Sequence, residues 1–417
     1  MPSSRSTLTP DDVRDFVDDH CFGPAPDGRV GVEVEWLPID LSHPTRSVPA
    51  GTVPVPGTEP GPAGSRVTLE PGGQVELSTP PLRGIGPACA ALAADAAALG
   101  HDLAERGVGL VGLGYDPRPA PPRRVEGPRY NAMEAYFDAQ CAAGRTMMRA
   151  TAAVQVNVDL GPSGATAEKR WHRAHDLGPT LAAAFANSPL GDDGPSGWRS
   201  KRQAVWSDVD SCRTSTADNV DVDCREAWAR YALDARVMLI RRDAQRYVPI
   251  LEPLSFAEWV AAGHELGYPT LADLEYHLTT LFPPVRPRGW LELRMIDSLP
   301  DPWWRAAVAV AVTLVVDDAA AAACADALAP TRGLWREAAR HGLDHPQLAA
   351  AAAACFDSAL EALSRLGTDA ATTAAVAAFH ERYSARGRCP ADDRLAEWAA
   401  DGTVLPAADR FLELTWV

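Results

Sequence analysis

Four segments that lie far apart in the chain alternate apolar and polar residues with a period of two. Successive side chains of a β-strand point to opposite faces of the sheet, so each segment predicts a strand with one apolar and one polar face. The segments are 31–36, 74–78, 152–160 and 290–297, with polar faces made of Glu33, Glu35, Gln74, Glu76, Ser78, Gln155, Asn157, Asp159, Glu292 and Arg294. Because the four polar faces share one chemistry, we expect them to line a common cavity while the apolar faces pack on helices.

A further carboxylate, Glu70, stands within the second of these strand signals, which covers residues 67–78. Pro71-Gly72-Gly73 follows it and predicts a turn or a bulge. Such a turn would bring Glu70 close to Glu76 on the polar face. Alternatively, Glu70 is only a turn residue that the Pro-Gly-Gly segment aims elsewhere.

Helices and long connections make up most of the remaining chain. We expect helices from Pro10 to about residue 20 and over 87–106, 129–145, 164–186 and 225–237. The Pro/Gly-rich stretch 42–66 is expected to be a connection, residues 187–206 a loop, and the polar stretch 207–224 an exposed loop. Residues 107–112 match G-x-G-x-x-G, but a proline cluster follows instead of a helix, so a plain strand is the better interpretation.

From Trp303 to about Trp398 the chain is alanine-rich and predicts several packed helices. The chain thus predicts an α+β fold with an antiparallel or mixed sheet. We expect one domain over 1–417. The sheet-containing core would occupy 1–300, with helices on one face of the sheet, and 301–417 would form a helical C-terminal region.

The charge of the chain narrows the classes of partner. A net charge of −16 opposes binding to nucleic acid and to anionic membranes. The first 16 residues lack the apolar core of an export signal, and the longest apolar run, 306–316, is too short to span a bilayer. Eight cysteines without a C-x-x-C pair give little support to a zinc site or a disulfide framework. We therefore expect a cytoplasmic protein, with monomer favoured, that binds small molecules but neither nucleic acid nor membrane.

The carboxylates of the polar faces predict a metal site. Clustered carboxylates raise one another's pKa unless cations neutralise them. Oxygen ligands without His or Cys select hard ions such as Mg²⁺ or Mn²⁺, and Mg²⁺ commonly completes its shell with substrate phosphates. The polar face therefore predicts phosphoryl transfer from ATP. The sequence contains no G-x-x-x-x-G-K-[ST] motif, so a P-loop is not expected to hold the nucleotide.

Basic residues should then bind phosphates and anionic substrates. Arg294 shares the acidic face, and Arg149 just precedes the third strand. Arg199, Lys201 and Arg202 form a basic run between Trp198 and Trp206. Such a run is commonly a solvated charged patch, but the flanking tryptophans favour a binding loop.

Eight motifs follow one another over roughly residues 31–305. They are GVEVEW, LEPGGQVELS, GYDPR, RYNAMEAYF, MMRATAAVQVNVD, FANSP, GWRSKRQAVW and LELRMIDSLP. In this order they resemble the plant-type glutamate-cysteine ligases, and most closely the actinobacterial branch that serves ergothioneine biosynthesis. The helical tail carries little of the resemblance.

The resemblance implies a glutamine-synthetase-like sheet and an enzyme that joins L-glutamate and L-cysteine with ATP and magnesium. Its product would be γ-glutamylcysteine, formed through a γ-glutamyl phosphate. By position within the motifs, it implies that Glu33, Glu35, Glu70, Glu76 and Glu292 hold the metal, with Gln155 beside them. It further implies that Arg294 stabilises the transferring phosphoryl group and that Glu292 has a catalytic role. Substrate contacts would come from Arg149, Gln155, Asn157, Arg199, Arg202 and Trp206.

Three alternatives stay open from the sequence. A related ATP-dependent carboxylate-amine ligase would use the same metal and phosphate machinery with another amine. A non-catalytic magnesium- or nucleotide-binding protein would bind ATP without releasing ADP. A glycoside hydrolase needs only two carboxylates, so five acids and an arginine on one sheet disfavour it.

Overall fold

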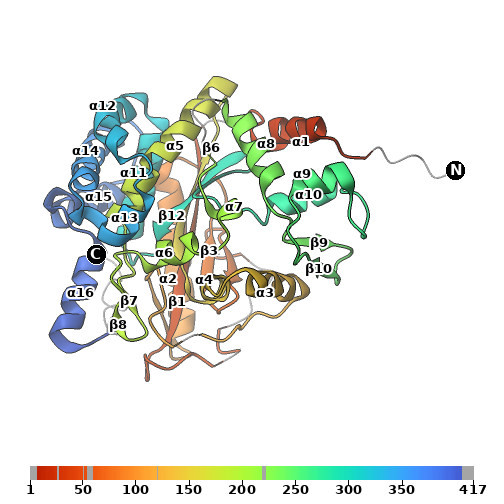
Figure 1. Ribbon diagram of the computed structural model, residues 1–417. Helices are drawn as coiled ribbons and strands as arrows, with labels where there is room; N and C mark the ends of the chain where they lie inside the picture. Colours follow the sequence, from red (N-terminus) through yellow and green to blue (C-terminus); the bar gives the residue numbers. More distant parts are fainter. Residues whose placement is uncertain are drawn as a thin grey trace.

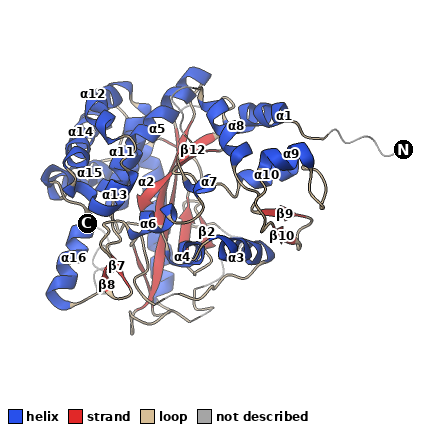
Figure 2. Ribbon diagram, viewed as in Figure 1, coloured by secondary structure: helices blue, strands red, loops and turns tan. Residues whose placement is uncertain are grey.

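The computed structural model describes residues 7–25, 28–49, 51–53, 60–119, 121–217 and 222–405 (Figure 1). Within these ranges, eight strands form one antiparallel sheet in the order β11-β12-β6-β1-β3-β2, with β4 and β5 also paired to β1. The strands are β1 (Arg29–Asp40), β2 (Arg66–Leu69), β3 (Val75–Ser78), β4 (Leu82–Arg83), β5 (Val108–Val111), β6 (Ala153–Asp159), β11 (Val285–Pro287) and β12 (Trp290–Asp297). Figure 2 shows this sheet running through the middle of the molecule with helices around it. The predicted α+β fold with an antiparallel sheet is confirmed.

The long strand β1 organises the sheet and sets the register of the polar residues. Glu35 lies opposite Glu76 of β3, and Glu33 lies opposite Gln155 of β6. In turn, Asn157 of β6 lies opposite Glu292 of β12. The predicted strands over 31–36, 152–160 and 290–297 are thus neighbours in one sheet. The signal over 67–78 is a hairpin of two strands, β2 and β3, rather than one strand.

The apolar face of the sheet packs against three long helices, as the alternation predicted. Val32, Val34 and Val156 are fully buried in one core with residues of α2 (Ile85–Ala104), α5 (Gly164–Ala184) and α11 (Trp303–Val316). Almost every residue of α11 is buried, because this helix lies between the sheet and other helices. A helix that is apolar on all sides belongs in such a position. The first helix of the predicted C-terminal region therefore shares its core with the sheet.

The remaining helices surround this core (Figure 1). Helices α12–α15 pack beside α5 and α11, whereas α1 and α8–α10 lie at the other side of the molecule. Their bounds are α1 (Pro10–Phe16), α3 (Pro128–Gln140), α4 (Ala143–Ala150), α6 (Lys201–Ser207), α7 (Ser211–Thr214), α8 (Cys224–Asp234), α9 (Phe256–Ala262), α10 (Leu271–Leu278), α12 (Asp318–Leu328), α13 (Trp335–His341), α14 (Pro346–Leu363), α15 (Ala370–Arg382) and α16 (Pro390–Asp401). A π-helix (Val17–Cys21) extends α1. Short 3₁₀ turns join the later helices at Ala329–Thr331, Gly342–Asp344 and Ser384–Arg386. Two small hairpins pair β7 (Leu190–Gly191) with β8 (Gly194–Pro195) and β9 (Leu239–Arg241) with β10 (Tyr247–Pro249).

Two of the expected connections contain regular structure. Residues 187–206, expected to be a loop, include the β7–β8 hairpin and most of α6. The stretch 207–224, expected to be an exposed loop, contains α7 and a fully buried ion pair between Asp210 and Arg213 at 3.0 Å. Residues 218–221 of that stretch lie outside the described ranges. The expectation of exposure was wrong because Arg213 finds its other partners far along the chain, including the hydroxyl of Tyr136.

The helix predicted over 129–145 also differs, because it breaks near residue 141 into α3 and α4. Among the described residues, no single helix is long and apolar enough to cross a membrane. Helix α11 is long and apolar enough for a membrane span only if it is combined with the next segment, Asp318–Thr331, and the two are bent by 98° relative to each other.

Candidate active site

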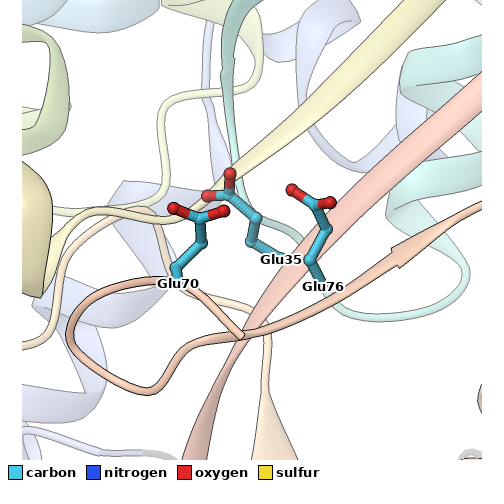
Figure 3. Close-up of side chains that lie close together, drawn as sticks. All are labelled: Glu35, Glu70 and Glu76. Atoms are coloured by element: carbon cyan, nitrogen blue, oxygen red, sulfur yellow. The ribbon is translucent and has the colours of Figure 1, made fainter. Parts of the chain in front are cut away.

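Three carboxylates converge on the polar face of the sheet. Glu35 comes from β1, Glu76 from β3 and Glu70 from the turn between β2 and β3 (Figure 3). One oxygen from each lies within 4.8 Å of the others. Among the described residues, this is the one such group of His, Cys, Asp or Glu side chains close enough to share a metal ion. The sequence left open whether the turn brings Glu70 close to Glu76, and in the structure the two carboxylates lie together.

The Pro-Gly-Gly turn determines where Glu70 points. The amide of Gly73 donates to the carbonyl of Glu70 at 2.7 Å, which closes a tight turn. Gly73 has a φ of +90°, a conformation that residues with a Cβ rarely adopt. At Gly72, a Cβ atom would lie 2.0 Å from the carbonyl oxygen of Arg149. Both glycines are therefore needed to seat the turn against the end of α4 with Glu70 among the other carboxylates.

Backbone and hydroxyl donors orient the other two carboxylates of the cluster. The amide of Ala153 donates to Glu35 Oε2 at 2.8 Å, and Gln155 Nε2 donates to Glu35 Oε1 at 3.3 Å. Glu76 Oε1 accepts from the hydroxyls of Thr68 at 2.8 Å and Ser78 at 2.9 Å. These bonds leave Glu76 Oε2 without a hydrogen bond among the described residues, so it remains available to a ligand.

Burial and crowding raise the pKa values of three acids on this face, Glu33, Glu35 and Glu70. Burial, followed by the charges of Glu70 and Glu76, raises the pKa of Glu35 well above its ordinary value. Burial and the neighbouring Glu76 raise the pKa of Glu70 to about 7. Glu33, buried and close to Glu292 and Glu76, also has its pKa raised to about 7. Buried acids with these pKa values bind a proton or a cation more readily than isolated surface acids do.

Glu33 belongs to a second row on the same face. Its Oε1 accepts from Asn157 Nδ2 at 2.9 Å, and Asn157 Oδ1 accepts from the indole of Trp290 at 2.9 Å. The amide of Asn157 is therefore used within the sheet. Its expected substrate contact stays a prediction, since the structure shows it as a link between Glu33 and Trp290.

Glu292 lies among arginines rather than in the carboxylate cluster. It accepts from Arg286 Nε at 2.5 Å and lies 3.2 Å from Arg294 and 3.5 Å from Arg288. Burial alone would raise its pKa, but Arg286 and Arg294 outweigh burial and lower it. An acid already paired with three cations is poorly suited to bind a metal. The arrangement instead makes Glu292 a residue that positions Arg294, and its predicted roles in metal binding and catalysis are not supported by this placement.

Arg294 occupies the position that the sequence predicted, at the centre of the polar face. It donates to Gln155 Oε1, while the other end of the Gln155 amide reaches Glu35. Burial alone would lower its pKa, but Glu292, Glu35 and Glu33 outweigh this effect and raise it. Gln155 thus connects Arg294 to Glu35 of the carboxylate cluster.

Sequence reasoning missed Arg286 and Arg288. Arg286 lies between Val285 and Pro287 on β11 and stands directly opposite Glu292, and Arg288 follows the end of this strand. The signal was present in the period-two pattern of 285–288, but the prolines and glycine of this segment concealed a strand of only three residues.

The basic run divides between two locations. Arg202 is buried beside the site and donates to the backbone carbonyl of Arg294 at 2.8 Å. It is held by Asp297, which itself accepts from Ser188 at 2.6 Å and Ser200 at 2.8 Å. Together with Trp206 and Arg294, Arg202 lines a small cavity of about 20 Å³. Arg202 Nη1 and Trp206 Nε1 are buried and donate to no acceptor in the described part of the chain. Both donors therefore suit an anionic substrate group, and the substrate contacts of Arg202 and Trp206 stay a prediction.

Arg199 is not brought together with these residues. Its guanidinium pairs with Asp344 at 2.5 Å and with Asp392 at 2.8 Å, in the C-terminal helical part of the chain. This placement favours a structural role over the predicted substrate contact. Arg149 pairs with Glu134 of α3 and lies behind the turn that carries Glu70.

The donor set of the cluster fits a hard divalent cation. All its side-chain donors are carboxylate oxygens, the ligand type that Mg²⁺ and Mn²⁺ prefer. Glu35, Glu70 and Glu76 are the residues that would hold such an ion, with Glu33 nearby. The raised pKa values of Glu33, Glu35 and Glu70 are the expected sign of negative charge that lacks a counter-ion.

Comparison with known proteins identifies the class and then the family. The fold matches that of a bifunctional glutathione synthetase from Pasteurella multocida, with a TM-score of 0.53 over 92% of this chain and 52% of that one. The sequence identity is 15%, so this match defines the fold alone. The profile of glutamate-cysteine ligase family 2 (GCS2) matches residues 29–408, and the chain belongs to this family.

Similar relatives agree with this assignment. Glutamate-cysteine ligase EgtA of Mycolicibacterium smegmatis is 49% identical over 81% of this chain and 80% of its own length. The protein of the same name from Mycobacterium tuberculosis is 42% identical over 94% of this chain and 93% of its own length. The chloroplastic glutamate-cysteine ligase of Medicago truncatula is 34% identical over 57% of this chain and 47% of its own length. The resemblance inferred from the eight motifs is confirmed.

Proposed function

We propose that the chain is an ATP-dependent glutamate-cysteine ligase that forms γ-glutamylcysteine. The observation that carries this proposal is the cluster of Glu35, Glu70 and Glu76 next to Arg294 on the polar face of the sheet. Such a face can hold a metal ion and a polyphosphate together. Membership of the family and the similarity to two ligases over most of the chain support the choice of glutamate, cysteine and ATP as substrates.

In this reaction, a side-chain carboxylate oxygen of glutamate takes the γ-phosphoryl group of ATP, and ADP leaves. The amine of cysteine then forms a bond to the acyl carbon, the bond from that carbon to the phosphate oxygen breaks, and the nitrogen loses a proton. Magnesium, when bound, would neutralise charge on the phosphates. The product is an amide, and the free energy comes from the hydrolysis of one ATP to ADP and phosphate.

The residues of the chain would divide these tasks. Arg294 faces the transferring phosphoryl group and stabilises its charge, as preorganised cations do in phosphoryl transfer. Glu292 holds the guanidinium of Arg294 in place, and Gln155 orients it toward the carboxylate cluster. Arg202 Nη1, which lies 3.9 Å from Asp297 but makes no hydrogen bond, and Trp206 Nε1 would bind an anionic group of the donor substrate.

The remaining predictions concern context. We place the enzyme in the cytoplasm, favour a monomer, and assign its product to ergothioneine biosynthesis, the pathway served by the branch that the motifs resemble. Loss of the gene should lower ergothioneine, and an unchanged level would contradict the pathway assignment.

The direct test is ADP release by the full chain with Mg-ATP and L-glutamate, comparing L-cysteine with other amino acids and simple amines. Cysteine-dependent release with γ-glutamylcysteine identified by mass would establish the activity. Release that depends on a different amine would move the assignment to a related carboxylate-amine ligase. Nucleotide binding without release under any condition would mean that the cluster is a binding site without catalysis.

A further inference from the structure

The strand β12 departs from regular pairing with β6 in the middle of the sheet. The register of the two strands shifts between Leu293 and Ile296. Two residues of β12, Arg294 and Met295, therefore stand where β6 has only Gln155. Such an extra residue is a β-bulge, and bulges beside active sites commonly re-aim a side chain. The side chain that projects from this bulge is that of Arg294.

The bulge also decides what the end of β12 presents. Without the extra residue, the alternation that puts Glu292 and Arg294 on the polar face would put Ile296 there as well. With it, Ile296 is fully buried in the core under the apolar face. Asp297 then takes the polar position, opposite Ala153 of β6. The bulge thus sets the directions of Arg294 and Asp297 together.

Side chains of α6, which lies beside β12 (Figure 1), hold the backbone of the bulge. Arg202 Nη2 donates to the carbonyl of Arg294 at 2.8 Å. Gln203 Nε2 donates to the carbonyl of Met295 at 2.7 Å. An extra residue disrupts the ladder, and a backbone carbonyl away from water needs another donor. Two consecutive residues of α6 thus supply one donor each to two consecutive carbonyls of the bulge.

Asp297 ties the start of α6 to the same strand. Its carboxylate accepts from the hydroxyls of Ser188 at 2.6 Å and Ser200 at 2.8 Å. The hydroxyl of Ser188 in turn accepts from the backbone amide of Arg202 at 3.2 Å. That of Ser200 accepts from the backbone amide of Gln203 at 3.1 Å. Because both the backbone and the side chains of α6 are bonded to β12, the helix is fixed over the bulge.

We propose that Gln203 is a positioning residue, which holds the bulge through the carbonyl of Met295 and so aims the guanidinium of Arg294 at the carboxylate cluster. The proposal rests on the proposed ligase function and adds a residue that acts through the backbone. Gln155 accepts from the guanidinium itself, whereas Gln203 fixes the strand from which Arg294 projects. Arg202 holds the neighbouring carbonyl but would also contact a substrate, so Gln203 is the better residue to replace.

The first experiment compares the steady-state kinetics of Gln203→Met with those of wild type. Methionine has a similar length and cannot donate a hydrogen bond. Gln347→Met, at an exposed glutamine on α14, is the matched control. We expect kcat to fall about 10–100-fold, the cost of a misplaced catalytic group, with KM values for ATP and glutamate within about twofold of wild type. An unchanged kcat would overturn the proposal.

The same kinetics separate positioning from substrate contact. Gln203 lines the cavity of about 20 Å³ together with Arg202 and Trp206, so a direct contact with glutamate is the competing role. A direct contact predicts a higher KM for glutamate in Gln203→Met. That result would overturn the proposal, because a positioning residue changes kcat.

A second variant, Gln203→Glu, keeps the shape of the side chain and replaces the donor by an acceptor. Its carboxylate repels the carbonyl of Met295, so kcat should fall at least as far as in Gln203→Met. The unfolding temperature of both variants should stay close to that of wild type, because Gln203 is only partly buried. A folded Gln203→Glu protein with the kcat of wild type would show that the donated hydrogen bond is not needed.

A double-mutant cycle tests whether Gln203 acts through Arg294. Arg294→Lys keeps a positive charge but lacks the rigid fork of a guanidinium. In this background, Gln203→Met should lower kcat by less than about twofold, because the group that it aims is gone. A further loss as large as that in wild type would mean that Gln203 acts independently of Arg294, and the proposal would be wrong.

Amide hydrogen exchange tests the bulge without any turnover. In Gln203→Met, the amides of residues 294–297 should exchange about tenfold faster, while those of β1 keep their rates, because only the bulge loses a partner. Equal exchange in variant and wild type would overturn the proposal. If wild type releases no ADP with any amine, the ligase function fails, and exchange then decides separately whether Gln203 holds the bulge.

Discussion

One face of the sheet carries two groups of charged side chains with opposite surroundings: a cluster of three partly buried carboxylates, and one buried carboxylate among arginines. Glu35, Glu70 and Glu76 crowd together, and burial with mutual repulsion raises the pKa of Glu35 and Glu70. Glu292 is more deeply buried, at 1% exposed, and is surrounded by arginines, which lower its pKa. The second group carries its counter-charges within the protein, and the first leaves room for cations from solution. We therefore expect Glu292 and its arginines to maintain the structure, and the cluster of Glu35, Glu70 and Glu76 to bind a ligand.

Replacing Glu292 should have the largest effect on the folded state. Glu292→Gln leaves the buried Arg286 without its carboxylate, and breaking a buried ion pair in this way costs about 3–5 kcal/mol. We expect a free energy of unfolding lower by this amount in denaturant titrations. Glu265→Gln, at an exposed position, should change it little. A stable Glu292→Gln protein would mean that the arginine group does not maintain the structure.

Glu76→Gln should act in the opposite way, on activity rather than stability. The variant removes one charge of the cluster and keeps the shape, so turnover should fall about 10²–10³-fold, the size of effect seen when one electrostatic contact to a transition state is lost. The protein should stay as stable as wild type, because one source of repulsion is gone. A large drop in thermal stability would instead mark Glu76 as a structural residue.

Magnesium should sharpen the comparison, because only one of the two groups can accept it. At a concentration of 100 times its Kd, an ion that binds the folded state stabilises it by about 2.7 kcal/mol. We expect Mg²⁺ to raise the unfolding temperature of wild type and Glu265→Gln, EDTA to reverse this, and Glu76→Gln to respond much less. An equal response of Glu76→Gln would show that the ion binds away from the cluster.

The smallest effect should appear in the dependence of stability on pH. Glu33 and Glu70 have pKa values raised from about 4.5 to about 7, so they favour the folded state at low pH, and this contribution is lost as pH rises from about 4.5 to 7. Glu292, with a lowered pKa, favours the folded state above about 4.5 and loses this contribution as pH falls. Without metal, stability should therefore fall as pH rises across 5–7, because the acids of this face then become charged.

Denaturant titrations across this pH range would measure the slope. Mg²⁺ should flatten it, since a bound cation favours the charged carboxylates. Removing one repelling charge in Glu76→Gln should also reduce the slope. A metal-free protein whose stability rises over pH 5–7, with no difference between wild type and Glu76→Gln, would contradict the proposed crowding of the cluster.

Much of the sheet could be predicted because its signal is local. The alternation in 31–36, 152–160 and 290–297 depends on neighbouring residues alone, and it assigned Glu33, Glu35, Gln155 and Arg294 to one face correctly. The glycine pair after Glu70 likewise indicated a tight turn from local chemistry. The family followed from motifs whose order is a property of the sequence.

The predictions that failed share one cause. Whether a charged side chain is buried depends on partners that lie far away in the sequence. Asp210 and Arg213 lie in a polar stretch, yet both are buried because Tyr136 and Arg236 supply partners from other segments. Arg199 and Arg202 are only three residues apart, yet they serve different parts of the molecule. The first pairs with Asp344 in the C-terminal helical part, and the second, inside α6, reaches β12.

The sequence by itself determined the strands, their polar faces, the turn that carries Glu70 and the family. Strand propensity, the period-two alternation and the family motifs all depend on residues that are close together in the sequence. Only the tertiary structure decided which carboxylates share a site. Glu292 lies on the same face as Glu35, but the strand β11 brings Arg286 to Glu292, while the β2–β3 hairpin brings acids to Glu35. A side chain's charge is known from the sequence, whereas its electrostatic environment depends on which strands lie beside it and at what register.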